Sequence, residues 1–516
     1  MAAAVADGDH FRCIRSPDSA ILWRVLRPAQ RHNRSRPPSC AKPAASMDAI
    51  AKIAFVALLV FAAALRIWLC FSDDGIFWPD EIYQSLEPAH HLVFGYGLLP
   101  WEFVRGARSW AFPGLVAGLL RTAAWLTGDH PRHYLVAVRL AFSAISMLTA
   151  WGTYQLARAC GARAVGASLA ALCFALSPAT IYFAPRAMTE TASALAVAFG
   201  LALTLRSQAS RRQEVIGALL LGLSVLFRLQ NALFCLGLLG ILLARKQWRR
   251  LGWCTVLLLV AAVAYGALDR VTWGSWYHSV GEYLRFNVVE GKSAQWGVSE
   301  PTLYLRVLWT SMPLVMVWVA LLALPGGRRS IGLLLTAVAY VVVHSVVGHK
   351  EFRFLIPVLP VLFALTGAGF CMVVAWRPSL LKVSAFVVAA TLTLAACRFH
   401  GLTFGDFGQY GPDRARDSAF DDSGPINRLL LVAHDQPDLC GIAVLAAPLS
   451  WTGGATYLHR NVPMYGPGAW PGVRNFNYAV VRGASQGRVV AAEGSYALVS
   501  LGHPSCLADP KFQWRL

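Results

Sequence analysis

Charged side chains are scarce in this 516-residue sequence, where Asp, Glu, Lys and Arg together make up 14% of the residues. Soluble domains carry about 25%. Hydrophobic residues make up 56%, and the mean hydropathy is +0.50. These values exclude an ordinary soluble protein and indicate a polytopic membrane protein. The 46 basic residues fall in short clusters between apolar runs, such as Arg211-Arg212 and Arg328-Arg329. Such clusters are typical of membrane topology signals, so we predict membrane lipids and no nucleic acid as partners.

Several chemical motifs are missing. The eleven cysteines include no Cys-x-x-Cys pair and have no histidine-rich companion segment, which argues against zinc. No phosphate-binding glycine loop or dinucleotide fingerprint is present, so no nucleotide-binding domain is evident. Cys440 and Cys506 lie in the polar C-terminal part, where we expect them to pair if that part faces an oxidising compartment.

Three regions follow one another along the chain. Residues 1–46 are rich in Arg, Ser, Pro and Ala, and we predict that they are disordered. Met1 and Met47 are both possible starts. Residues 47–398 form the membrane part, and residues 399–516 have the short strand-like runs and turn residues of a small α/β domain, with a helix near 424–435. The strands are expected at 441–445, 478–481 and 496–500.

Twelve apolar runs are long enough to suggest helices. They occur near 51–71, 110–127, 134–157, 165–184, 190–206, 214–227, 232–244, 251–268, 303–324, 331–347, 354–375 and 380–397. The runs at 214–227 and 232–244 are marginal in length, and we expect either that amphipathic ends extend them or that they are broken helices around Arg228 to Asn231. If the N-terminus is cytoplasmic, all basic clusters lie on one side only when one of the first two runs after residue 72 does not cross the membrane. The best candidate is 110–127, as an interfacial or re-entrant helix on the outer side, which leaves about eleven transmembrane helices. The acidic loop 72–133, the turn before residue 353 and the tail after 398 then share the outer face.

The acidic loop contains the first candidate for chemistry, the adjacent carboxylates of Asp80 and Glu81. A carboxylate at a partly dry membrane surface has a raised pKa, which suits a general base. The alternative is ordinary helix-start chemistry after Pro79. Asp269 and Arg270, at the mouth of another span, are better explained as part of an interfacial belt.

A second candidate is the turn from His349 to Phe354, which places three basic side chains on the face where positive charge is normally avoided. A Lys point charge and an Arg fork suit a phosphate group. Arg228 lies within an apolar run and is either functional or a snorkelling residue at a helix end. Arg186 and Glu190 are spaced as a simple ion pair one helical turn apart.

Three segments resemble the signatures of the family 22 (Alg9-like) mannosyltransferases, in particular the glycosylphosphatidylinositol-anchor branch of that family. The likeness covers roughly residues 50–400. The matching segments, in the family's order, are Pro79–Glu87 with His90-His91, Phe94–Gly97 and Trp101-Glu102, then Leu268–Trp276, and then His349–Pro357. Trp78 and Ile82 depart from the family's pattern and leave the acceptor open.

The resemblance implies an all-α polytopic GT-C fold. It also implies transfer of mannose from polyprenyl- or dolichyl-phosphate-mannose to a glycolipid or lipid-linked glycan, with inversion at the sugar C1. Asp80 would be the general base, with Glu81 assisting. The donor phosphate would be held by His349, Lys350 and Arg353, and we add Arg228 to this group. The acceptor would be positioned by Gln84, Glu87, His90, His91, Trp101, Glu102 and Glu351.

Because Lys and Arg supply the positive charge, this prediction includes no cofactor and no metal. The site would face the periplasm from the inner (plasma) membrane of a bacterium or the lumen from the endoplasmic reticulum membrane of a eukaryote. The alternative function is that of a lipid-linked sugar transporter or flippase. A transporter favours internal repeats and charges near the bilayer midplane. The sequence shows no repeat, and its charges cluster at one surface.

Overall fold

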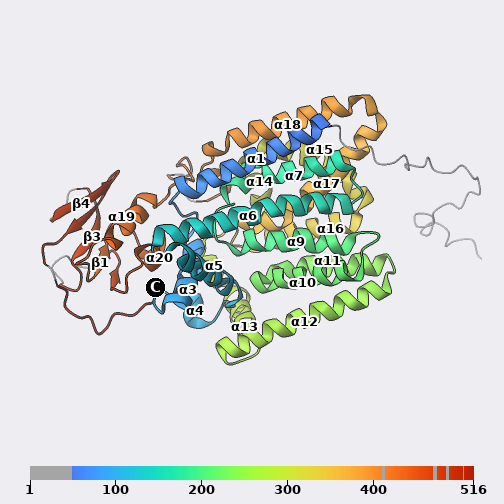
Figure 1. The fold of residues 1–516 in the computed structure, drawn as a ribbon. Coiled ribbons are helices and arrows are strands. Elements are labelled where there is room, and N and C mark those ends of the chain that lie inside the picture. Colours follow the sequence, from blue (N-terminus) through green and yellow to red (C-terminus); the bar gives the residue numbers. More distant parts are fainter. Residues whose placement is uncertain (1–48, 410–412, 469–473, 484–486, 504) are drawn as a thin grey trace, which may run out of the picture. The chain divides into compact units, whose positions relative to one another are not determined.

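The computed structural model describes residues 49–409, 413–468, 474–483, 487–503 and 505–516. The segment 1–46, for which the sequence predicts disorder, lies outside these residues. The described chain is a bundle of helices followed by a small sheet (Figure 1). The α-helices before residue 399 are α1 Ala49–Ser72, α2 Pro79–Glu81, α3 Glu87–Phe94, α4 Trp101–Arg105, α5 Ala111–Thr127, α6 Pro131–Ala159, α7 Ala164–Ala175, α8 Pro178–Tyr182, α9 Thr189–Leu205, α10 Arg211–Phe227, α11 Ala232–Ala244, α12 Trp248–Trp273, α13 His278–Leu284, α14 Leu303–Ser311, α15 Pro313–Arg329, α16 Ile331–Val346, α17 Leu359–Trp376 and α18 Leu381–Cys397.

Short 3₁₀ or π segments connect or extend several of these helices. They are η1 Ile82–Leu86, η2 Leu229–Asn231, η3 Arg285–Val289, η4 Lys292–Trp296, η5 Phe352–Val358, η6 Pro378–Leu380, η7 Phe399–Gly401 and η8 Gly405–Phe407. The break predicted around Arg228 is confirmed. Helix α10 ends there because Arg228 has an extended backbone, and the Asn231 side chain donates to the Ser224 carbonyl across the break at 3.1 Å.

Within the described residues, four helices are long and apolar enough to cross a membrane: α1, α6, α12 and the joined segment Phe352–Trp376. The pair α14 and α15 qualifies as a fifth if it counts as one span, although it bends by 118°. Eleven spans would require six more helices to cross the membrane, namely α10 and the five shorter apolar segments α7, α9, η2 with α11, α16 and α18. The number eleven therefore stays a prediction.

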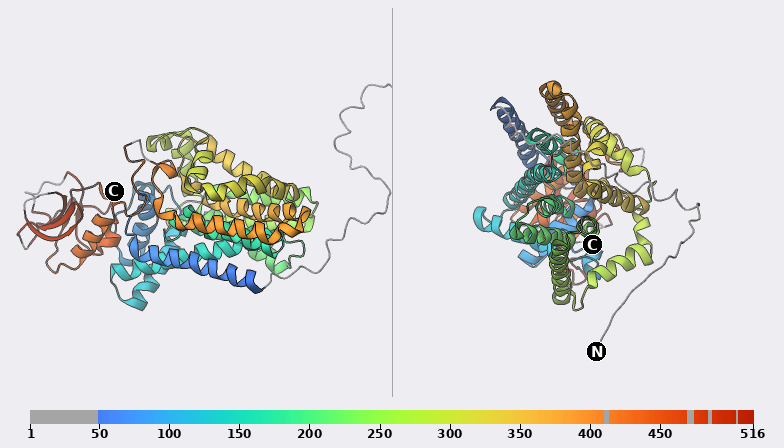
Figure 2. Two further views of the ribbon diagram at one scale, coloured as in Figure 1. Left: turned by 90° about the horizontal axis from the view of Figure 1, so that it is seen from above. Right: turned by 90° about the vertical axis from the view of Figure 1, so that its right-hand side faces the viewer.

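The loops sort into two groups at opposite ends of the bundle. Figure 1 shows α3, α4 and α13 at the end that also carries the C-terminal sheet, and the left view of Figure 2 agrees. The connections from α11 to α12 and from α17 to α18, which carry basic clusters, lie at the other end. This separation is the one that the topology prediction requires, because it puts the acidic loop and the tail on one face.

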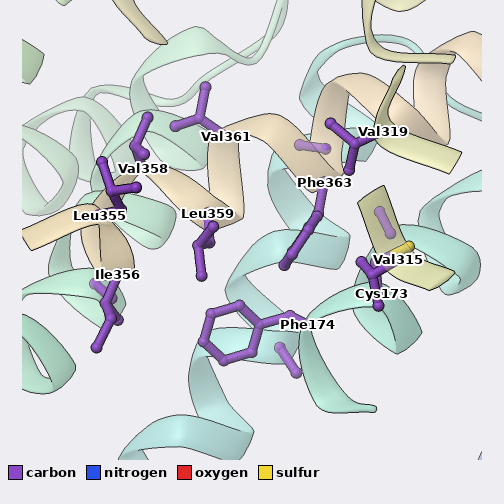
Figure 3. Close-up of a cluster of buried hydrophobic side chains, with 14 of the residues drawn as sticks. Cys173, Phe174, Val315, Val319, Leu355, Ile356, Val358, Leu359, Val361 and Phe363 are labelled. Atoms are coloured by element: carbon purple, nitrogen blue, oxygen red, sulfur yellow. The ribbon is translucent and has the colours of Figure 1, made fainter. Parts of the chain in front are cut away.

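The core of the bundle is formed where α7, α15 and α17 meet (Figure 3). Phe174 of α7 contacts Phe363 of α17, with the ring centroids 6.3 Å apart. Gly166 and Gly367 let these two helices approach closely, since a Cβ at either position would overlap the backbone oxygen of the other glycine. Small residues at such contacts are typical of helix packing in membranes.

The tail forms the predicted small α/β structure. Its sheet has the strand order β2-β1-β3-β5-β4, with β1 parallel to β2 and β3, and β5 antiparallel to β3 and β4. A disulfide joins Cys440 to Cys506, as the sequence suggests for an oxidising compartment. The elements are η9 Leu449–Trp451, α19 Gly424–His434, α20 Gly454–Leu458, β1 Ile442–Val444, β2 Met464–Tyr465, β3 Tyr478–Arg482, β4 Arg488–Glu493 and β5 Tyr496–Ser500.

Candidate active site

A cavity of about 650 Å³ opens between the acidic loop, the segment around α13 and η4, the C-terminal end of α16 and the turn before η5. The tail adds Ser450 and Trp451 to its wall. Segments that are almost 400 residues apart thus meet at one site. The cavity brings together seven of the residues that the sequence singles out, namely Asp80, Gln84, Trp101, Glu102, His349, Glu351 and Arg353.

The two adjacent carboxylates of α2 have different surroundings. Pro79 begins this short helix, so successive side chains point about 100° apart. Asp80 lines the cavity, whereas Glu81 is outside its lining. The Glu81 carboxylate accepts a hydrogen bond from the Phe77 amide at 3.1 Å and forms an ion pair with Arg186 at 2.8 Å. Only Asp80 is therefore placed to meet a substrate in the cavity.

The electrostatics of Asp80 suit a proton acceptor. Burial raises the pKa of its carboxyl group, and the neighbouring Glu351 acts in the same direction, while Arg353 acts against them. A base whose pKa is raised toward the working pH transfers protons most effectively. Asp80 contacts Arg353 directly through an ion pair.

Arg353 is the centre of a buried network of ion pairs. Its Nε donates to Glu351 at 2.6 Å and its Nη2 to the other oxygen of Glu351 at 2.9 Å. Its Nη1 lies 3.5 Å from Glu190, which also binds Arg228 at 2.5 Å. Arg228 therefore acts on the cavity through Glu190, because it is itself outside the lining of this cavity. The predicted pair between Arg186 and Glu190 is wrong, since Arg186 precedes α9 and binds Glu81 instead.

His349 lies at the rim of the same network. Its Nε2 is 2.9 Å from Glu351. Burial opposes protonation of this ring, but the hydrogen bond and the charge of Glu351 prevail and raise the pKa of His349. The histidine is therefore able to add a positive charge to this side of the cavity.

Glu102 and Gln84 form a second polar group on the lining, which contains a carboxyl group and an amide instead of basic side chains. Gln84 Nε2 donates to Glu102 Oε1 at 2.8 Å. Burial, followed by the negative charge of Asp80, raises the pKa of Glu102 to about 7. Because the carboxyl groups of Asp80 and Glu102 interact in this way, they do not readily both carry a negative charge.

Lys350 points away from the cavity. Its Nζ donates to the carbonyl oxygens of Ser299 at 2.8 Å and Gly348 at 3.4 Å, and the residue is outside the lining. These bonds join the turn before η5 to the loop before α14. The predicted contact of Lys350 with a donor phosphate is not part of this geometry and stays a prediction.

Glu87 and His90 also lie outside the lining, where they bind the tail. Glu87 accepts hydrogen bonds from the backbone N–H and the hydroxyl of Thr456 at 2.5 and 2.7 Å, and from the Leu98 N–H at 2.6 Å. His90 Nε2 is 2.9 Å from His459 Nδ1. These contacts hold the acidic loop against the tail, so these two residues shape the cavity from behind.

His91 and Asp269, which belongs to the signature Leu268–Trp276, are also outside the cavity lining. His91 is half-buried, and its Nδ1 has no hydrogen-bond partner among the described residues. Asp269 is buried and accepts hydrogen bonds from the N–H and the hydroxyl of Ser279, at 2.8 and 2.7 Å. It thereby holds the N-terminal turn of α13 rather than a substrate.

Sequence reasoning missed two basic residues on the lining. Arg108 is half-buried, lies over the Tyr283 ring and forms no ion pair within the described part of the chain. The Nδ1 atom of His344, in α16, lies 2.8 Å from the Tyr340 carbonyl oxygen. Because this oxygen can only accept, Nδ1 carries the hydrogen and Nε2 of the neutral ring is an acceptor. Arg108 lies in the loop 72–133 outside the segments that match the family's signatures, and His344 lies in the apolar run 331–347, so neither position indicates a site.

A profile of the Alg9-like mannosyltransferase family matches residues 57–421, which is more than half of the chain. The GPI alpha-1,2-mannosyltransferase 3 of Xenopus laevis is 28% identical over 62% of this chain and 61% of its own length. The GPI mannosyltransferase 3 of Yarrowia lipolytica is 32% identical over 59% and 60%. The chain thus spans about three fifths of these curated relatives.

The fold has a likeness among solved structures. ArnT from Cupriavidus metallidurans in the apo state superimposes with a TM-score of 0.59 at 14% identity, covering 87% of this chain and 98% of that one. The same protein bound to undecaprenyl phosphate gives 0.58 at 15% identity and the same coverage. ArnT has the GT-C fold expected from the sequence, and the likeness confirms that fold. By the family profile and the order of its signatures, this chain belongs to the Alg9-like mannosyltransferase family.

Proposed function

We propose that this protein is an integral membrane mannosyltransferase. It transfers mannose from a polyprenyl- or dolichyl-phosphate-mannose to a hydroxyl group of a glycolipid or lipid-linked glycan, with inversion, and forms an α-mannoside. The observation that carries the proposal is the position of Asp80, a carboxylate with a raised pKa on a cavity that also holds Arg353, Arg108 and His349. Membership of the family supports the sugar.

In the proposed reaction, Asp80 takes the proton of the acceptor hydroxyl as its oxygen forms a bond to C1 of the mannose. The bond between C1 and the phosphate oxygen breaks, and the polyprenyl phosphate leaves with the additional negative charge. Positive groups placed where that charge develops lower the barrier. Arg108 and Arg353 are the guanidinium groups on the lining that suit this role.

The ion pair between Asp80 and Arg353 provides a link between donor binding and base strength. Arg353 lowers the pKa of Asp80 by its charge and hydrogen bond. A donor phosphate that takes the Nη2 hydrogen bond from Asp80 removes one part of this effect, and its negative charge offsets the other, so the pKa of Asp80 rises and the carboxylate becomes a stronger base. Arg353 keeps its place during the exchange, because Glu351 and Glu190 hold its other nitrogens.

The lipid part of the donor is proposed by chemistry and by likeness. ArnT, which shares this fold, is bound to undecaprenyl phosphate in one of its structures. The part of the cavity lining that comes from α16, the turn after it and η4 includes the apolar side chains of Val343, Val347 and Trp296, which suit a polyprenyl chain. Trp78 and Trp451, on the side of the tail, leave room for the acceptor.

We propose the non-cytoplasmic face as the place of reaction, in the lumen of the endoplasmic reticulum or in the periplasm. The disulfide between Cys440 and Cys506 supports this, because disulfides persist in those compartments. The tail that carries it lies at the same end of the bundle as α3 and α4 (Figure 1).

The proposal is tested with purified full-length protein, radiolabelled polyprenyl-phosphate-mannose and a membrane lipid extract as acceptor. Asp80→Asn keeps the shape of the side chain and removes the base, so transfer is expected to fall about 10²–10⁴-fold. The control is Asp417→Asn, which removes an exposed carboxylate that is not part of the lining. Equal transfer by Asp80→Asn and the control shows that Asp80 is not the base. If no acceptor is labelled while the donor lipid crosses vesicles, the transporter alternative replaces the proposal.

A further inference from the structure

A group of histidines lies outside the cavity, where the start of α6 meets the end of α19. His130 is the residue before α6, His434 is the last residue of α19, and Asp435 follows it. One possible ligand atom from each of these three residues lies within 4.8 Å of the other two. All three are outside the lining of the active-site cavity. The proposed reaction uses none of them, and the distance in sequence hides their proximity.

His434 already has the tautomer that a metal ligand needs. Its Nδ1 is 3.0 Å from the Leu458 carbonyl oxygen, which can only accept, so Nδ1 carries the hydrogen and Nε2 has a free electron pair. Histidines that bind metals almost always donate their other ring N–H to such a carbonyl or carboxylate, which fixes the ring. The half-buried ring is thus held with its ligating atom ready.

His130 and Asp435 face each other at the same place. His130 Nε2 is 3.3 Å from Asp435 Oδ1. The His130 ring lies 5.0 Å from the His434 ring, measured between centroids. Two ligands at about 2.0–2.1 Å from a tetrahedral zinc ion are roughly 3.3 Å apart, so the existing separation fits one edge of a zinc site.

We propose that His130, His434 and Asp435 bind a zinc ion. Imidazole nitrogens select zinc and related transition metals over Mg²⁺ and Ca²⁺, which prefer oxygen ligands, and two histidines with one carboxylate form a common zinc set. Asp435 is exposed, which leaves the fourth position open to water.

Binding changes one hydrogen bond at His130. In the metal-free protein its Nδ1 accepts from the Arg132 N–H at 3.3 Å, so its Nε2 carries the proton that points to Asp435. The zinc ion takes that place, the ring proton moves to Nδ1, and the exposed Arg132 N–H turns to water. Besides the bond between His130 and Asp435, which the two bonds to zinc replace, the exchange therefore costs one long hydrogen bond at the surface.

The proposed ion would join the bundle to the tail. Its ligands come from two segments that are 305 residues apart, one leading into α6 and one leaving α19. The same junction holds His459, which is 3.0 Å from Asp129 and 2.9 Å from His90. Zinc would thus stabilise the contact through which the tail supplies Trp451 to the cavity.

The experiment measures zinc binding by isothermal titration calorimetry on the full-length protein in detergent, after treatment with EDTA. His130→Asn keeps a good helix cap while it removes the imidazole. His434→Asn and Asp435→Asn keep size and polarity, and His503→Asn is the control for the loss of a half-buried histidine elsewhere. The wild type and the control are expected to bind one Zn²⁺, each single variant at least tenfold more weakly, and the triple variant not at this site.

Thermal unfolding gives a second measurement that does not depend on mannose transfer. Zn²⁺ is expected to raise the unfolding temperature of the wild type and the control but not of the triple variant, because a ligand that binds only the folded state stabilises it. Mg²⁺ at the same concentration is expected to have no effect. Zinc binding that is undiminished in the triple variant, or no saturable binding by the wild type, overturns the proposal.

Discussion

Glu351 is the carboxylate that joins Arg353 to His349, so Glu351→Gln is a direct test of the network around the proposed base. The wild-type side chain accepts hydrogen bonds from Arg353 Nε at 2.6 Å, from Arg353 Nη2 at 2.9 Å and from His349 Nε2 at 2.9 Å. The side chains of Glu351 and Arg353 are 2% and 5% exposed, so water screens the pair weakly. Breaking a buried ion pair from one side costs about 3–5 kcal/mol.

The lower end of that range applies here. Arg353 retains Asp80 and Glu190, and glutamine keeps one oxygen as an acceptor. We therefore expect the substitution to lower the free energy of unfolding by about 3 kcal/mol near neutral pH. The pKa of Glu351 is lowered from 4.5 to about 2, by Arg353 and His349 against the effect of burial. The stabilisation is therefore present above pH 4.5 and lost as the pH falls through 2, and the difference between wild type and variant shrinks over that window.

The same substitution is expected to change catalysis in a particular way. An Arg353 that has lost its main partner no longer meets the leaving phosphate in a fixed position, so kcat is expected to fall roughly 10²-fold. Because Glu351 raises the pKa of Asp80, its removal lowers that pKa, and the rising limb of the rate against pH moves to lower pH. The assay is mannose transfer from the radiolabelled donor across a pH series, together with thermal unfolding in detergent.

Glu300→Gln is the matched control, because Glu300 forms an exposed ion pair with Arg306 at 3.7 Å. Exposed pairs contribute about 0–1 kcal/mol, so this variant should resemble the wild type. The reasoning is refuted if Glu351→Gln is as stable and as active as Glu300→Gln. A rising limb that moves to higher pH would refute the electrostatic part alone.

Three further substitutions test other parts of the arrangement. Glu81→Gln leaves the buried Arg186 with one carboxylate fewer, so it should lower the free energy of unfolding by about 3 kcal/mol, measured by thermal unfolding. The donor KM should stay unchanged, and a changed donor KM would contradict the placement of Glu81 outside the cavity. Trp451→Ala removes a ring from the wall beside the tail and should raise the acceptor KM but not the donor KM, and equal increases in both would count against our division of the cavity. Cys440→Ser opens a disulfide loop of 66 residues, which should destabilise the sheet by about 4 kcal/mol and make the tail sensitive to protease, whereas resistance equal to the oxidised wild type would speak against it.

Much of the fold could be predicted because it rests on local patterns. Apolar runs, basic clusters and alternating strand patterns each lie within a short stretch of chain. The break between helices at Arg228 and the strands at 478–481 and 496–500 could be predicted from such patterns. The 118° bend between α14 and α15 did not follow, because the apolar run 303–324 is continuous in composition and breaks at Met312 before Pro313.

The candidate site was predicted in part. The signatures named Asp80, Glu351 and Arg353, which the structure brings to one cavity. They also named Glu87 and Lys350, which stand in the same motifs but bind the tail and a neighbouring loop. A motif reports which residues are near in sequence, whereas the direction of each side chain depends on the helix that carries it and on what packs behind it.

The sequence by itself determined the class of the protein and its family, because composition and the order of the signatures are properties of the chain alone. Only the tertiary structure gave Asp80 and Glu81 different surroundings, since Arg353 binds the first and Arg186 the second, each from more than 100 residues away. The meeting of His130 with His434 and Asp435 was decided there too. The cysteine pattern argues against zinc, but it says nothing of histidine and carboxylate ligands that come from distant segments, because such ligands have no characteristic spacing in the sequence. Ion pairs and ligand sets are made by proximity in space, which no local pattern contains.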